Sequence, residues 1–115
     1  IENVIYFDLD KFNIRKDAEV ELAKVYEVLN QYPKMKIDVR SHTDSRATDA
    51  YNQKLSDQRA ESTMNWLVKQ GINQSRLIGK GYGESRLVNE CKDGVECSED
   101  QHQKNRRSEF IITDL

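Results

Sequence analysis

Asp44 and Arg59 are the two residues whose types and spacing most suggest a binding site. Asp44 follows a stretch of alternating apolar residues, and Arg59 lies inside a segment with helical periodicity. A carboxylate accepts hydrogen bonds from an ammonium group, and a guanidinium can hold a carboxylate through two parallel hydrogen bonds. The pair can therefore recognise a zwitterion, such as the end group of an amino acid. The alternative is an ordinary surface ion pair, which contributes about 0–1 kcal/mol to stability.

Two further residues share a helix face with Arg59. Asn52 and Leu55 precede it at helical spacings, so all three side chains project from one side of the expected helix. Asp44 lies where a strand gives way to a loop, and loops on rigid scaffolds commonly present ligand-binding groups. We expect the loop and the helix to converge on one site.

Catalysis, metal binding and nucleotide binding have little support from the residues. Ser41, His42 and Asp44 include the side-chain types of a catalytic triad, but neighbouring residues of a strand point to opposite faces and cannot form the relay. His42 and Asp44 are also too few ligands for a metal site. The segment Gly79–Gly83 lacks the Gly-Lys-Ser/Thr ending of a phosphate-binding loop, and a tight turn explains its glycines better. We expect a binding protein with no catalytic residues, cofactor or metal.

Length and charge restrict the class of protein. A chain of 115 residues is long enough for one domain. It carries 18 Lys and Arg residues against 20 Asp and Glu residues, a net charge of −2, so no nucleic-acid partner is expected. No apolar run approaches the roughly 20 residues that cross a bilayer. Because the chain starts at Ile1 rather than Met, we expect a mature fragment or an excised domain.

Cys91 and Cys97 are close enough in sequence to form a disulfide. Asp93 and Gly94 between them are typical turn residues that can bring the two thiols together. Free thiols are the first alternative, and a zinc site with His102 is the second, although a structural zinc needs four ligands. A disulfide closing so short a loop would add roughly 2 kcal/mol and would imply an oxidising compartment.

The hydrophobic periodicity predicts alternating strands and helices. Apolar residues recur every three or four positions in the first helix until Pro33 ends it, and in the next segment apolar and charged residues alternate. The expected strands are Asn3–Asp8, Met35–Arg40, Leu77–Tyr82 and a last strand from Ser108, and the expected helices are Lys16–Gln31, Asp49 or Ala50 to Gln70, and Ser98–Lys104. This β-α-β-α-β order, followed by a short helix and a final strand, predicts an α/β (α+β) fold. A mixed sheet with helices packed on one face is expected.

Two local signals mark the helix ends. Gly71 is expected just beyond the end of the second long helix, and Ser98 with Gln101 forms a capping-box pattern for the short helix. The cysteine-bearing segment Val88–Glu96 is predicted to be a loop.

Five ordered motifs spread over the whole chain carry a resemblance to a known family. They are Ile5-Tyr6-Phe7-Asp8-Leu9-Asp10, His42-Thr43-Asp44-Ser45, Asn52-x-x-Leu55-Ser56-x-x-Arg59-Ala60, Gly79-x-Gly81-Tyr82-Gly83-Glu84 and Asn105-Arg106-Arg107-Ser108-Glu109. With these motifs the chain resembles the OmpA-like domain, the C-terminal peptidoglycan-binding module of outer membrane protein A, the peptidoglycan-associated lipoprotein and flagellar stator proteins.

The resemblance implies non-covalent capture of the peptidoglycan stem peptide. Asp44 and Arg59 occupy the positions that hold diaminopimelate in the family, whose free amino acid end group suits the zwitterion argument above. The implied role is to tether the outer membrane to the cell wall from the periplasmic face of a Gram-negative envelope. The whole chain, residues 1–115, would be one domain, the C-terminal part of a larger envelope protein. The domain itself would not be inserted in the membrane but attached to an outer-membrane anchor. The alternative is a structural or protein-interaction module without a ligand.

The resemblance also implies secondary roles. Phe7 and Asp8 would border the pocket, and Leu55 would form a wall. Thr43 and Asn52 would hydrogen-bond the ligand or shape its loop, although Asn52 could equally cap the helix.

The last implied contact and one departure from the family concern the rim of the pocket. Arg107 would lie near a second carboxylate of the ligand. Many family members have glycine where this chain has Ser41 and Ala47. Alanine is unfavourable where the backbone needs a positive φ, so we expect the loop after Asp44 to have a shape of its own.

Overall fold

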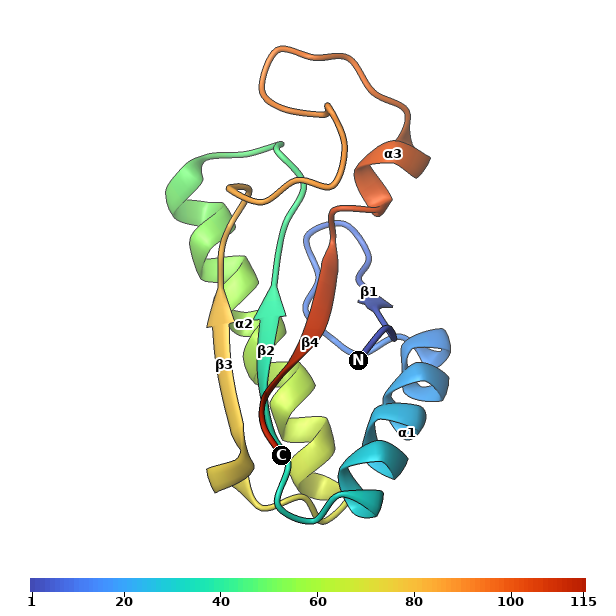
Figure 1. The fold of residues 1–115 in the computed structure, drawn as a ribbon. Helices are drawn as coiled ribbons and strands as arrows, with labels where there is room; N and C mark the ends of the chain where they lie inside the picture. The colour runs from blue at the N-terminus through green and yellow to red at the C-terminus, as the bar shows by residue number, and fades with distance from the viewer.

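Four strands form one mixed sheet in the computed structural model, which describes all 115 residues. The strands are β1 (Ile5–Tyr6), β2 (Lys36–Ser41), β3 (Leu77–Gly81) and β4 (Arg107–Asp114), arranged in the order β1-β4-β2-β3. β2 and β3 run parallel, whereas β4 is antiparallel to both β1 and β2 (Figure 1). The predicted α/β fold with a mixed sheet is therefore confirmed.

The helices differ in length and in their relation to the sheet. They are α1 (Lys16–Gln31), α2 (Asp49–Lys69), the 3₁₀ turn η1 (Gln74–Arg76) and α3 (Glu99–Gln103). The buried stripe of α1 consists of Ala18, Leu22, Val25 and Leu29, as the periodicity predicts. These residues join apolar residues of β1, β2, β4 and α2 in one core, so α1 and α2 cover one face of the sheet. No helix is both long and apolar enough to span a membrane.

Local capping signals account for the helix ends. Thr48 caps α2, since its hydroxyl accepts a hydrogen bond from the Tyr51 amide. Gly71 follows the end of α2 with φ at 112°, which confirms its predicted place just beyond the helix. The predicted capping box of Ser98 and Gln101 is present at the start of α3.

The strands agree with prediction to within one residue at most ends, but β1 is shorter than the expected Asn3–Asp8. The chain turns after Phe7, and Asp10 adopts a positive φ of 58°. The Phe7 carbonyl accepts hydrogen bonds from the side chains of Gln103 and Arg106 instead of a strand neighbour. Side-chain donors from the end of the chain thus decide where β1 ends.

Close packing of α2 on β3 explains two of the glycines. A Cβ atom at Gly81 would collide with the Ser56 hydroxyl and the Asp57 backbone nitrogen, and one at Gly79 would collide with the Met64 side chain. The sequence predicted a tight turn for all the glycines of Gly79–Gly83, but of these only Gly83 has a positive φ, at 54°. The other two let α2 lie directly against the sheet, which brings Arg59 to the end of β2.

Candidate functional site

A cavity of about 210 Å³ lies where the loop after β2 meets α2. Its walls come from four parts of the chain: Leu9, Asp10, Thr43, Asp44, Arg46, Ala47, Leu55, Arg59 and Arg106. Both members of the predicted binding pair therefore face the same space. The volume is below the roughly 300–1,000 Å³ typical of drug-sized pockets, which suits a small end group rather than a whole ligand.

Asp44 is a buried carboxylate surrounded by arginines. Its Oδ1 accepts a hydrogen bond from the Arg46 backbone nitrogen at 3.0 Å, and its Oδ2 lies 2.9 Å from Arg46 Nη2 and 3.1 Å from Arg106 Nη1. Burial alone would raise the pKa of Asp44, but the hydrogen bonds from Arg46 and Arg106 outweigh it and lower the pKa. The group is an anion at neutral pH, ready to accept hydrogen bonds from a cation.

Arg59 is fully buried and holds three backbone segments together. Its Nε donates to the carbonyl of Lys11 at 2.9 Å, its Nη1 to His42 at 3.0 Å and its Nη2 to Asp8 at 3.1 Å. The guanidinium lies 5.2 Å from the centre of the Phe7 ring. Burial, followed by repulsion from Arg106, lowers the pKa of Arg59 to about 10, so it stays charged at neutral pH.

The predicted pair is not an ion pair. Asp44 pairs with Arg46 and Arg106, whereas Arg59 donates to carbonyls. The surface ion-pair interpretation is therefore wrong, because both side chains are buried and each has other partners.

Arg106 is a cavity residue that the sequence analysis missed. Besides Asp44, it contacts Glu99 Oε1 at 2.9 Å and donates through Nε to the Phe7 carbonyl at 2.9 Å. The family resemblance implied a ligand contact for its neighbour Arg107, which does not line the cavity. Arg107 instead pairs with Glu109 at 3.1 Å and donates to the Arg86 carbonyl. Neighbouring residues at the start of a strand point in opposite directions, so the Arg106-Arg107 motif offered two candidates and no local signal to choose between them.

The other predicted cavity residues divide into two groups. Thr43 and Leu55 line the cavity, and the Thr43 hydroxyl donates to the Asp44 carbonyl at 2.9 Å. Phe7 and Asp8 do not line it. Phe7 is buried beneath Arg59, and Asp8 contributes only its backbone carbonyl to that arginine.

Asn52 shapes the loop rather than capping α2. Its Nδ2 donates to the Arg46 carbonyl at 2.9 Å and to Glu84 Oε1 at 3.2 Å, and the side chain is buried. The cap belongs to Thr48. Asn52 thus holds the segment that carries Asp44 and Arg46 against the helix.

Ala47 adopts the positive φ that the sequence analysis considered unfavourable for alanine. Its φ is 75°, a left-handed conformation that costs a non-glycine residue roughly 1–2 kcal/mol. The position keeps the backbone shape that suits glycine, even though it carries a Cβ atom.

His42 lies on the other side of β2 from Ser41. Its ring is buried, stacks on Tyr82 with centres 5.5 Å apart, and places Nε2 3.0 Å from Glu109 Oε1. Burial, with help from Arg107, lowers the pKa of His42 to about 4, so the ring is neutral at pH 7. Ser41 Oγ pairs with Ser108 Oγ at 2.6 Å, so Ser41, His42 and Asp44 do not form a hydrogen-bonded triad.

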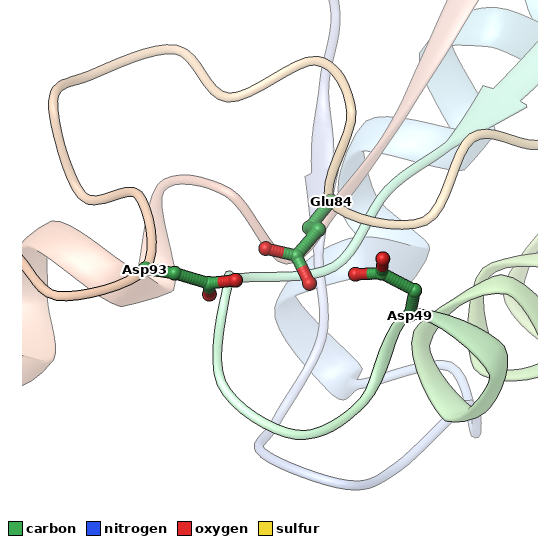
Figure 2. Close-up of side chains that lie close together, drawn as sticks. All are labelled: Asp49, Glu84 and Asp93. Carbon is green, nitrogen blue, oxygen red and sulfur yellow. The ribbon is translucent and has the colours of Figure 1, made fainter.

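Three carboxylates gather beside the loop that contains the cysteines. Asp49, Glu84 and Asp93 each place an oxygen within 4.8 Å of the others (Figure 2). Burial and hydrogen bonding with Asp49 raise the pKa of Glu84 to about 7, although Asn52 opposes the shift. With that pKa, Glu84 is partly protonated at neutral pH, which reduces the repulsion among the three carboxylates.

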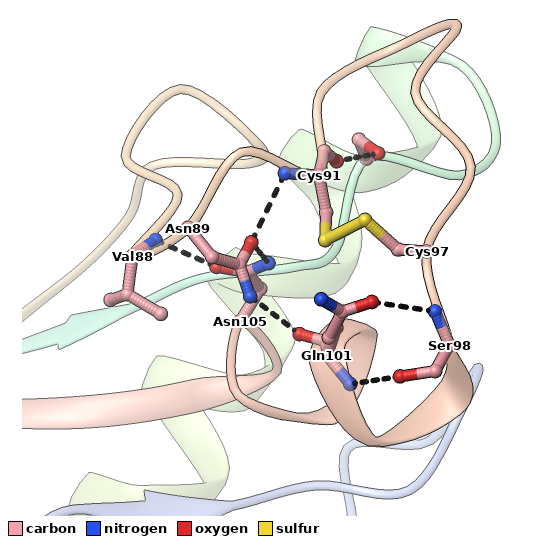
Figure 3. Close-up of a disulfide and its surroundings, with 8 residues drawn as sticks. Val88, Asn89, Cys91, Cys97, Ser98, Gln101 and Asn105 are labelled. Atoms are coloured by element: carbon pink, nitrogen blue, oxygen red, sulfur yellow. Dashed lines mark hydrogen bonds between the residues drawn. A yellow bond between two sulfur atoms is a disulfide. The ribbon is translucent and has the colours of Figure 1, made fainter.

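The predicted disulfide between Cys91 and Cys97 is present, with the two Cα atoms 5.9 Å apart. Asn89 Oδ1 accepts hydrogen bonds from the Cys91 amide at 3.2 Å and from Asn105 Nδ2 at 2.9 Å (Figure 3). The Cys91 carbonyl accepts a hydrogen bond from the Ser45 hydroxyl. The bridged loop is therefore fastened to the segment next to Asp44.

Solved structures share this fold. The structure of the peptidoglycan-associated lipoprotein from Burkholderia pseudomallei superposes with a TM-score of 0.86 over 97% of this chain and 91% of that one. The two sequences are 23% identical, so the similarity concerns the fold.

Curated relatives are more similar in sequence. The chain is 39% identical over 104 residues to the peptidoglycan-associated lipoprotein of Mesorhizobium japonicum, covering 90% of this chain and 59% of the relative. It is 41% identical over 88 residues to outer membrane porin F of Pseudomonas fluorescens, covering 76% of this chain and 27% of the porin. It is also 42% identical over 113 residues to a protein of Gloeobacter violaceus named photosystem I P700 chlorophyll a apoprotein A2, covering 96% of this chain and 13% of that protein.

These relatives are all longer than the chain, which spans between about an eighth and three fifths of their lengths. The sequence pattern of the OmpA family matches residues 6–101, which is most of the chain. The match includes β2, β3, both long helices and the loop that carries Asp44. The chain belongs to the OmpA family.

Proposed function

We propose that this domain binds the stem peptide of peptidoglycan without a covalent bond, through diaminopimelate, and so tethers the outer membrane to the cell wall. The observation that carries the proposal is the shared cavity of Asp44 and Arg59. A free amino acid end group has one ammonium and one carboxylate, and this cavity presents a buried carboxylate and buried guanidinium groups to receive them.

The arginines have donors to spare for a ligand carboxylate. A guanidinium has five N–H groups, and Arg59 uses three of them on the carbonyls of Asp8, Lys11 and His42. Two N–H groups remain for a ligand. Arg106 adds another buried positive charge to the cavity lining. Leu55 supplies an apolar wall, which fits the methylene chain of diaminopimelate.

The names of the relatives support the proposed location in the cell envelope. Two of them carry names that refer to peptidoglycan association and to the outer membrane. We place the domain at the periplasmic face of the outer membrane of a Gram-negative cell, attached to an anchor elsewhere in a longer protein. The disulfide is consistent with that oxidising compartment.

Calorimetry with a diaminopimelate-containing muropeptide tests the proposal. Asp44→Asn keeps the side-chain shape but removes the charge, so affinity should fall roughly 10- to 100-fold, the usual range for a lost charge-assisted hydrogen bond. Asp38→Asn is the matched control, because Asp38 pairs with Arg40 on the strand that leads to the site. Both proteins are first compared by thermal melting. Unchanged affinity in a folded Asp44→Asn protein would contradict the proposal.

Varying the ligand tests the arginine side without disturbing the fold. Arg59→Ala would remove the side-chain donor from three backbone carbonyls, one of them buried, so lost binding could reflect lost structure. A muropeptide with lysine in place of diaminopimelate lacks the second carboxylate and should bind much more weakly. Equal affinity for the two muropeptides would exclude carboxylate recognition.

One observation favours the alternative of a structural module. Arg59 is fully buried and already joins the β1 end, the following turn and β2, which is a complete structural role. If that role is the only one, no muropeptide binds, and sedimentation with purified sacculi shows no effect of excess free diaminopimelate.

A further inference from the structure

Arg46 lies between two hollows of the surface. It lines the cavity that contains Asp44, and it also lines a second cavity of about 640 Å³ formed with the disulfide loop. Ala47 is shared by both cavities as well. Arg46 therefore stands at the boundary between the candidate site and the space beside it.

The Arg46 side chain has two competing partners. Its Nη2 lies 2.9 Å from Asp44 Oδ2, and its Nη1 lies 3.0 Å from Glu99 Oε2. The Asp44 side chain is 5% exposed, whereas those of Arg46 and Glu99 are 39% and 58% exposed. One end of the guanidinium thus reaches a buried anion, and the other end lies nearer the solvent beside an exposed anion.

Arg46 is the partner of Asp44 that can leave. Arg106 also contacts Asp44 Oδ2, but it is buried and is fixed by the Phe7 carbonyl and by Gln103 Oε1. Exposed side chains change rotamer within picoseconds to nanoseconds. A cation that approaches Asp44 from solvent therefore meets Arg46 first, and like charges in contact with one carboxylate repel each other.

We propose that Arg46 is a gate on the candidate site: the ligand's ammonium group displaces the Arg46 guanidinium from Asp44, and Glu99 holds the displaced side chain. This inference rests on the proposed function, because it describes how the same cavity opens to its ligand. The exchange replaces one cation on Asp44 by another, so the buried carboxylate is never left with fewer partners. Arg46 lowers the affinity for the ammonium, and Glu99 offsets part of that effect.

Variants at the two positions should change the affinity in opposite directions. Arg46→Gln removes the competing charge, so the affinity for the diaminopimelate-containing muropeptide should rise roughly two- to five-fold, the range of a partly exposed ion pair. Glu99→Gln leaves Arg46 and Arg106 with Asp44 as their shared carboxylate, so the affinity should fall by a similar factor. Arg46→Lys keeps the positive charge and should bind as wild type does.

Two controls make the measurement specific. Arg40→Gln changes an arginine of similar exposure that pairs with Asp38 away from the cavity, and it should leave the affinity unchanged. A muropeptide whose free amine is acetylated has no ammonium, so it should show no gain with Arg46→Gln. All affinities are measured by calorimetry on proteins whose melting curves show that they are folded.

The results separate the gate from the proposed function. If wild type binds the muropeptide and Asp44→Asn does not, but Arg46→Gln binds equally or more weakly than wild type, the gate is refuted and the binding function stands. A gain that also appears with the acetylated muropeptide refutes the gate too. If wild type does not bind the muropeptide at all, both proposals fall.

Discussion

Individual residues of the proposed binding site also support the fold. Arg59 holds three backbone carbonyls, including that of His42, which immediately precedes the loop with Asp44. Asn52 holds the Arg46 carbonyl in the same way from the face of α2. Polar contacts to the backbone thus fix the Arg59 side chain and the path of the loop that carries Asp44, so this part of the proposed site is ordered without a ligand.

His42 gives the stability of the domain a dependence on pH. Its pKa in the folded protein is lowered to about 4, while that of an unfolded histidine is about 6.5. Between these values the unfolded chain binds the additional proton, so stability is complete above pH 6.5 and falls as the pH drops towards 4. For so deeply buried a ring the loss amounts to at most roughly 3 kcal/mol.

His42→Gln is expected to make the free energy of unfolding less dependent on pH in this range. Urea unfolding between pH 4.5 and 7.5 would show the change. Glu84 changes the stability in the opposite direction. Its pKa is raised to about 7 in the folded protein, so its contribution to stability is lost as the pH rises from 4.5 towards 7. It is present in both proteins, so the difference between their two curves isolates His42. Parallel curves would show that His42 is not the titrating group.

At the level of elements, the packing of α2 against β3 positions the site. Arg59 on α2 reaches the end of β2 because the helix lies directly on the glycines of β3. Two polar contacts at Gly81 and one at Gly83 strengthen this packing. Asp57 Oδ1 accepts from the Gly81 amide at 3.0 Å, Gln53 Nε2 donates to the Gly81 carbonyl at 2.7 Å, and Ser56 Oγ accepts from the Gly83 amide. Loss of the close approach would move the whole helix face that carries Asn52, Leu55 and Arg59.

Gly81→Ala is expected to destabilise the domain by about 1–3 kcal/mol, the usual cost of forcing extra volume into a packed contact. The added Cβ meets the Ser56 hydroxyl and the Asp57 backbone nitrogen, and backbone cannot move aside cheaply. Gly79→Ala is the matched control, because its Cβ meets only side-chain atoms, chiefly the flexible end of Met64. Urea unfolding should therefore rank Gly81→Ala as the more harmful change. Equal losses would mean that α2 shifts freely on β3.

At the scale of the whole molecule, the disulfide loop is an appendage on the sheet and helix core. No residue between Gly83 and Glu99 belongs to the cluster of buried apolar residues, yet the loop contacts the site through Ser45 and Cys91. The core thus maintains the fold, and the loop forms one wall of the larger cavity beside the site.

Replacing both Cys91 and Cys97 by alanine is expected to lower stability by roughly 2 kcal/mol, the chain-entropy estimate for a short closed loop. Far-ultraviolet circular dichroism should stay the same, because no strand or long helix includes the loop. Thermal melting of the variant and of reduced wild type, each compared with oxidised wild type, checks the effect. The mass change on alkylation with and without reductant first shows that wild type carries the bond. Loss of the whole circular dichroism signal would contradict this division between core and loop.

Short-range signals in the sequence determined much of this protein. The helical stripe of α1, Gly71 after α2, the capping box of Ser98 and the pairing of two nearby cysteines all depend on residues within a few positions of one another. Such interactions are readable along the chain, and so was the membership of the OmpA family.

Tertiary structure alone decided the partners of the charged groups. Arg59 binds carbonyls 17 to 51 positions away, and Asp44 meets Arg106 rather than Arg107. Arg46 lies between two cavities. All of these contacts depend on how distant segments of the chain meet. A buried guanidinium takes whichever acceptors surround it, because leaving its donors unpaired is costly. Residue type predicts that partners exist, and the packing of α2 on the sheet determines which ones they are.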